Sequence, residues 1–215
     1  MNKWYQKIST VIAVSLVYMA IAVPYAWSSG NSEFVFYCLV MIVLGALVGL
    51  VHWHVKLSIG VLWGLSFWGA MHMAGGLMHI PESWPIAGEI RVLYSWWLIP
   101  GYLKYDHVVH AFGFAMTTVV CWQCVRRLAG DIRPSYGVML LCGAAGMGFG
   151  AFNEIVEFVA TLTVPDTNVG GYINTGWDLV ANMVGAIMAC TWIKLRYAAA
   201  NPSVSSVMES EPPLS

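Results

Sequence analysis

Charged side chains are scarce in this 215-residue sequence. Asp, Glu, Lys and Arg together make up 10% of the residues, whereas hydrophobic residues make up 59%. A soluble domain averages about 25% charged residues. With so few charges the chain cannot cover a water-facing surface, so we expect lipid to be its main solvent and the bilayer to be its main partner.

The sequence also lacks an excess of basic residues and a framework of cysteines. The net charge is −1, which excludes a nucleic-acid partner because phosphate binding needs a basic face. The five cysteines fall in or beside apolar runs, so no disulfide framework is expected. The CxxC formed by Cys121 and Cys124 is interpreted as packing, because buried cysteine usually behaves as a small hydrophobe.

Long hydrophobic runs are what the sequence does have. A helix needs about 20 apolar residues to cross a bilayer, and six segments qualify. We therefore predict an all-α, polytopic bundle of about six transmembrane helices, forming a single domain over residues 1–200 with a disordered cytoplasmic tail over 201–215. The first segment is interpreted as an uncleaved helix rather than a signal peptide. The predicted spans are 8–27, 33–51, 57–78, 106–128, 136–162 and 177–197.

The distribution of Lys and Arg predicts the orientation. With the N-terminus inside, eight of these residues are cytoplasmic and only Arg91 and Lys104 are outside. Cytoplasmic loops carry the excess of Lys and Arg, so both termini are predicted to face the cytoplasm of a bacterial inner (cytoplasmic) membrane. The outer connection 79–105 is long and is expected to form a short interfacial helix or a re-entrant segment.

Acidic, amide and histidine residues gather at four of the predicted helix ends. They lie at the end of the third span, the start of the fourth, the end of the fifth and the start of the sixth, and in an up-and-down bundle these ends share one side. Such residues are costly to insert in lipid, so each is a functional hypothesis. The residues are His72, Asp106, His110, Asn153, Glu154, Glu157, Asp178 and Asn182.

Asp, Glu and His together form the ligand set of zinc, manganese or non-haem iron sites. We therefore predict a divalent metal held by Asp106, His110, Glu154, Glu157 and Asp178, with Glu154, Glu157 and Asp106 as catalytic residues. His72, Asn153 and Asn182 are expected to support the site.

Several members also have structural interpretations. Asp178 is explained equally by a charge at a helix N-terminus, and Asn182 by a hydrogen bond between helices. His107 follows Asp106 directly, so both cannot point inward, and we expect His107 at the membrane interface. The pair Gly146 and Gly150 predicts close packing of the fifth helix.

Four motifs resemble a known family. The stretches HMAGG (72–76), YDHVVHAFGF (105–114), NEIVEF (153–158) and WDLVANMVGA (177–186) resemble the YjdF family of bacterial inner-membrane proteins. VanZ-like proteins are similar more distantly, and where they often carry Gln this chain has Glu157. The resemblance implies a multi-pass inner-membrane protein and no particular reaction.

Three functions are compatible with these observations. The first is a metal-assisted hydrolase or transferase acting on a lipid or envelope precursor at the outer face. The second is a proton-coupled transporter, although we find no inverted repeat of the kind that many transporters show. The third is a structural or partner-binding protein, which agrees with the absence of a GxSxG nucleophile motif.

The orientation can be tested with reporter fusions. Alkaline phosphatase fused after Glu89, in the predicted outer connection, is expected to be active, and a fluorescent protein fused after Ala200 is expected to fluoresce. The opposite pair of results would place the polar residues at the cytoplasmic side.

Overall fold

The computed structural model describes residues 3–130, 132–165 and 167–202. Six α-helices follow one another: α1 (Lys3–Ser28), α2 (Ser32–Val55), α3 (Ile59–Leu77), α4 (Tyr105–Ala129), α5 (Tyr136–Thr163) and α6 (Tyr172–Ala200). The prediction of an all-α bundle is confirmed. The predicted tail lies almost entirely outside the described residues, which end at residue 202.

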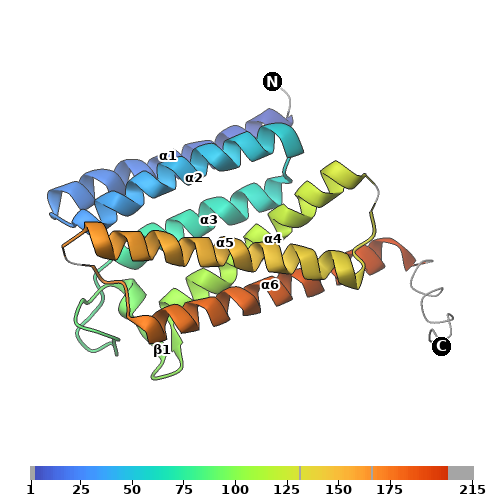
Figure 1. Ribbon diagram of the computed structural model, residues 1–215. Helices are drawn as coiled ribbons and strands as arrows, with labels where there is room; N and C mark the ends of the chain where they lie inside the picture. Colours follow the sequence, from blue (N-terminus) through green and yellow to red (C-terminus); the bar gives the residue numbers. More distant parts are fainter. Residues whose placement is uncertain (1–2, 131, 166, 203–215) are drawn as a thin grey trace.

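The helices run up and down, so that their ends alternate between two sides (Figure 1). α1 begins and α6 ends at the same side of the bundle, and the connections α1–α2, α3–α4 and α5–α6 lie at the other. The helix ends follow local chemistry: the Asn31 side chain accepts a hydrogen bond from Phe34 N at the start of α2, and Ser135 accepts one from Val138 N at the start of α5.

Five helices in the described part of the chain are long and apolar enough to cross a membrane, namely α1, α2, α4, α5 and α6. The predicted third span corresponds to α3, which has 19 residues. α3 packs against α1 and α4. Large apolar side chains cover the outside of the bundle: Leu140 and Leu141 are 74% and 70% exposed, as expected of residues that face lipid.

The connection between α3 and α4 contains no α-helix, so of the two predicted forms the interfacial helix was wrong. It forms a one-turn 3-10 helix (Leu93–Ser95) and a hairpin of β1 (Trp97–Ile99) and β2 (Leu103–Lys104). Pro81, Pro85 and Pro100 explain the difference, because proline cannot donate the backbone hydrogen bonds that a helix needs. The hairpin lies at the end of the bundle where α4 and α6 begin (Figure 1).

Glycines bring α4, α5 and α6 together. A Cβ atom added at Gly146 would overlap Thr118 of α4, and one added at Gly150 would lie 2.5 Å from Asn182 Nδ2 of α6. A Cβ atom at Gly185 would overlap the carbonyl group of Ala111. The predicted close packing at Gly146 and Gly150 is confirmed.

The packing of α6 on α4 predicts a stability difference between two glycine variants. Gly185→Ala is expected to lower the melting temperature in detergent, because the new methyl group meets backbone that cannot move aside, and overpacking costs about 1–3 kcal/mol. The control is Gly148→Ala in α5, where an added Cβ atom meets nothing within 4 Å. Equal melting temperatures for the two variants would contradict this packing.

Candidate metal centre

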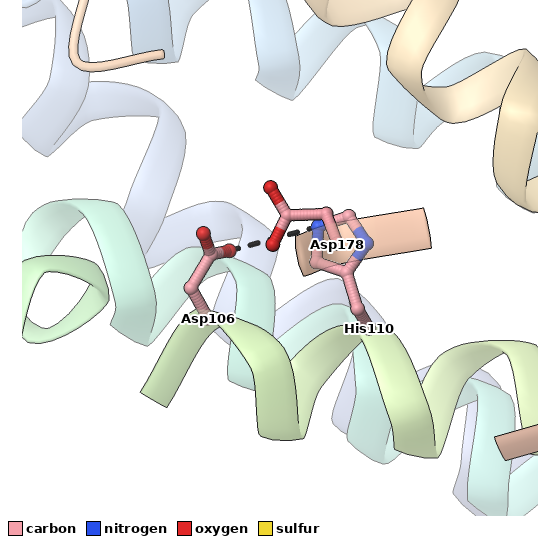
Figure 2. A group of neighbouring side chains, drawn as sticks. All are labelled: Asp106, His110 and Asp178. Carbon is pink, nitrogen blue, oxygen red and sulfur yellow. Dashed lines mark ion pairs between the residues drawn. The ribbon is translucent and has the colours of Figure 1, made fainter. Parts of the chain in front are cut away.

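His110 of α4 lies at the centre of the polar residues. Its side chain is 2% exposed, and its Nε2 atom is 3.6 Å from Oδ1 of Asp106, one turn earlier. Residues four positions apart lie on one helix face, so α4 presents both groups in the same direction. Figure 2 shows the Asp106 and His110 side chains on successive turns of α4, with the Asp178 carboxylate of α6 beside them.

α6 supplies Asp178 and Asn182 to the same place. Oδ1 of Asn182 lies 3.1 Å from Nδ1 of His110. The Asp178 side chain is fully buried, and its Oδ2 atom accepts a hydrogen bond of 2.6 Å from Asn174 Nδ2. Because α6 begins at Tyr172, Asp178 lies beyond its first turn. The interpretation of Asp178 as a charge at the helix N-terminus is therefore wrong.

α5 supplies the two glutamates. Oε1 of Glu154 is 3.6 Å from Nδ1 of His110, and Oε1 of Glu157 is 3.9 Å from its Nε2. Asn153 Nδ2 donates a hydrogen bond of 2.9 Å to Glu157 Oε1. Three helices thus direct four carboxyl groups toward one imidazole, as the sequence pattern predicted.

The cluster has more acceptor oxygens than its hydrogen-bond donors satisfy. Within the described residues, both carboxyl oxygens of Glu154 and Oδ1 of Asp178 are buried without a hydrogen-bond partner. Buried polar atoms nearly always have a partner, and a charge excluded from water is costly unless it is paired or binds a metal. The donor set therefore suits a cation.

Two overlapping groups have the geometry of metal ligands. Asp106, His110 and Asp178 form the first, and His110, Glu154 and Glu157 the second; in each, one ligand atom per residue lies within 4.8 Å of the others. Both groups contain His110, so they describe one centre with alternative ligands. A set of one imidazole nitrogen and several carboxylate oxygens is suited to manganese, iron or zinc.

Lys104 is a site residue that sequence reasoning missed. Its Nζ atom lies 3.1 Å from Asp106 Oδ2 and also contacts Asn174 Oδ1, and its side chain is 10% exposed. In the sequence, Lys104 contributes only a charge to the predicted outer connection. The spacings Lys104-x-Asp106 and Asn174-x3-Asp178 were visible in the sequence, but neither indicates that the two pairs meet.

Tyr94 of the 3-10 helix is a second residue that sequence reasoning missed. Its hydroxyl group makes a hydrogen bond with Nδ1 of His72, and its ring packs where a Cβ atom of Gly75 would lie. Burial raises the pKa of the Tyr94 phenol well above its ordinary range, so the hydroxyl stays protonated and can donate a hydrogen bond. His72 is thus tied to the outer connection and lies beside the cluster rather than within it.

His107, which we expected to point away from the interior of the bundle, is buried. It is 6% exposed, its Nδ1 atom accepts a hydrogen bond from Lys104 N, and its ring lies near those of Trp97 and Trp177. The reason is the hairpin, which folds over the start of α4 and covers His107.

Two adjoining cavities give access to the cluster. The site cavity, of about 70 Å³, is lined by His72, Tyr94, Asp106 and Glu157 together with apolar residues of α2. The outer cavity, of about 200 Å³, shares Tyr94 and Asp106 with it and is also lined by Lys104. Both are large enough for water, which needs about 10–15 Å³.

Comparison with known proteins identifies the family. A model of predicted membrane proteins (DUF2238) matches residues 10–199. The chain belongs to this family. No curated protein and no solved structure matched the chain. The protein is therefore a multi-pass membrane protein embedded in a lipid bilayer. Its helical bundle contains a buried cluster of His, Asp and Glu.

The ion pair of Lys104 predicts a loss of stability. Lys104→Met keeps the length of the side chain and removes its charge, so Asp106 is left without its lysine partner. Removing one partner of a buried ion pair costs about 3–5 kcal/mol, and a clearly lower melting temperature in detergent is expected. Lys7→Met, at an exposed position of α1, is the control; an equal effect of both changes would show that the pair contributes nothing.

Proposed function

We propose that this DUF2238 protein is a membrane-embedded, metal-dependent hydrolase or transferase. In this proposal it acts on a lipid or an envelope precursor at the outer side of the bacterial inner membrane. The closer resemblance to the YjdF family, and the more distant one to VanZ-like proteins, agree with that location. The observation that carries the proposal is that both Glu154 oxygens and Asp178 Oδ1 are buried beside His110 without a hydrogen-bond partner among the described residues.

The proposed metal ligands are Asp106, His110, Glu154, Glu157 and Asp178. A divalent ion bound among them would supply a Lewis acid and a water activated as a nucleophile. Asn182 and Asn153 orient His110 and Glu157 through their hydrogen bonds. Such outer contacts fix the direction of metal ligands and contribute to affinity.

Glu157 and Asp106 are the proposed acid–base residues, because both line the site cavity and Glu154 does not. In hydrolysis, Glu157 takes a proton from the attacking water, and the resulting hydroxide forms a bond to the carbonyl carbon or phosphorus of the substrate. The bond to the leaving oxygen then breaks, and that oxygen receives the proton. A transferase follows the same course with an acceptor hydroxyl group in place of water. Glu154 is proposed to act through the metal.

The geometry favours an enzyme over the two alternatives. Residues that only join helices are expected to satisfy one another, but Glu154 accepts no hydrogen bond from the described residues. A proton-coupled transporter needs polar groups along the whole path. The halves of α3, α4, α5 and α6 on the other side of the cluster offer no buried Asp, Glu or His among the described residues.

Metal analysis of the purified protein tests the proposal. Detergent-solubilised protein incubated with zinc, manganese or iron(II) and then desalted is expected to retain about one ion per chain, as the single shared histidine implies. Glu154→Gln and His110→Ala are each expected to lower the metal affinity at least tenfold, since each removes a ligand; losses of about 10–100-fold follow even the loss of outer contacts.

Matched controls separate the site from general effects. Glu82→Gln and His54→Ala change the same residue types at exposed positions and are expected to leave binding unchanged. Size-exclusion profiles and melting curves show whether each variant is folded. Folded wild-type protein that binds none of the three metals would refute the proposal, as would full binding by both site variants.

A further inference from the structure

A third cavity lies between α1, α2 and α3, and we call it the apolar cavity. Its volume is about 430 Å³, within the range of roughly 300–1,000 Å³ that is typical of ligand pockets. No Asp, Glu, Lys or Arg is among the residues that line it. Two of its polar residues, Ser15 and Ser66, are hydrogen-bonded to each other at 2.7 Å. Tyr18 and His52 also line it, and its remaining lining is apolar, so the cavity suits an apolar molecule.

The apolar cavity adjoins the site cavity. Met41, Leu44 and Trp68 line both, so one wall of α2 and α3 continues from the apolar cavity toward Asp106 and Glu157. A molecule that occupied both cavities would therefore have an apolar part beside α1–α3 and a polar part beside the carboxylates.

The length of the apolar cavity fits a lipid chain. Its lining follows α2 from Met41 to His52, twelve residues that extend over about 16 Å at the rise of an α-helix. This is about half of the roughly 30 Å hydrocarbon core of a bilayer. Because α2 begins at the side of the cluster, it is the half that lies farther from the cluster. Ile12, Leu16 and Ile42 line the cavity and are also exposed on the lipid-facing surface, so a chain can enter sideways from the bilayer.

Two glycines of α2 keep this space open. Gly45 and Gly49 line the apolar cavity, and a Cβ atom added at either position would meet nothing within 4 Å. They do not bring helices into contact, unlike Gly146 and Gly150 of α5. Their lack of a side chain leaves room that a larger residue would fill.

We propose that the apolar cavity holds the hydrocarbon chain of a lipid substrate whose head group lies in the site cavity at Asp106 and Glu157. The inference rests on the proposed function and names its substrate class: a long-chain amphiphile whose head group reaches the cluster and whose chain extends into the half of the bundle beyond it. A water-soluble envelope precursor, which has no hydrocarbon chain, would leave the apolar cavity unused.

Photolabelling tests this placement. The full chain is reconstituted in phosphatidylcholine nanodiscs that contain a few per cent of phosphatidic acid with a diazirine near the middle of one acyl chain. After illumination, adducts are mapped by mass spectrometry. The yield on Val48, Leu62 and Leu65, which line the cavity, is expected to be several times that on the lipid-facing Leu140 and Leu141. Equal or lower yields in the cavity would mean that bulk lipid alone reaches it and would overturn the proposal.

Filling the cavity supplies the matched comparison. The double variant Gly45→Leu/Gly49→Leu is expected to reduce cavity adducts at least fivefold. Gly148→Leu, which adds the same side chain at an exposed and open position of α5, is expected to leave them unchanged. A similar decrease in both variants would contradict the assigned position of the chain.

Metal binding distinguishes failure of this inference from failure of the proposed function. If the wild-type protein binds metal but the cavity is not labelled preferentially, the lipid-chain inference fails and the metal centre stands. If the cavity is labelled preferentially and no metal binds, the chain position stands and the metal-dependent reaction fails. If a chelator lowers cavity labelling in the wild-type protein but not in Glu154→Gln, the bound metal and the lipid chain belong to one site.

Discussion

The central constraint in this protein is the burial of four carboxyl groups around His110 inside an apolar bundle. Asp106, Glu154, Glu157 and Asp178 approach one imidazole from three helices, and Lys104 provides a cation at one edge. Lipid cannot solvate these groups. Their arrangement is tolerable only where charge is shared, neutralised by protons or balanced by a bound cation, so this constraint decides which functions the fold can support.

These groups can meet only if the helices pack closely, and glycine residues allow the helix backbones to approach one another. Gly150 lies against Asn182, which contacts His110, and Gly185 lies against the backbone of Ala111, one residue after His110. Gly185 belongs to the WDLVANMVGA motif, and Gly150 lies three residues before the NEIVEF motif. The motifs therefore combine two features that the site needs. One is a polar side chain directed into the bundle, and the other is a small residue that brings the helices close enough for groups on different helices to reach His110.

The fold and most of the cluster could be predicted from sequence, because both depend on local patterns. Apolar length predicted the helices, and the positions of Asp106, His110, Glu154 and Asp178 near alternating helix ends predicted that they would meet. Lys104, Asn174 and Tyr94 could not be predicted in the same way. Lys104 and Tyr94 belong to an irregular connection whose path has no periodicity, and Asn174 precedes the predicted start of α6, which was placed five residues too late. The burial of His107 could not be predicted for the same reason, since the hairpin that packs against it belongs to this irregular connection.

The oxygens of Glu154 and Asp178 that lack a hydrogen-bond partner among the described residues bear on the choice between a structural and a catalytic role. Interhelical hydrogen bonds in lipid contribute only about 0.6–2 kcal/mol each, whereas a buried acceptor without a partner costs about 1–3 kcal/mol. A cluster kept only to hold helices together would thus lose through Glu154 and Asp178 what Asn182 and Asn174 contribute. A ligand that binds the folded state adds stability in proportion to its concentration over its dissociation constant, so a bound cation would offset that cost. The adjoining cavities make the cluster accessible to a substrate. Asp106 and Glu157 are the carboxylates of the cluster that line the site cavity, and a substrate would contact them there.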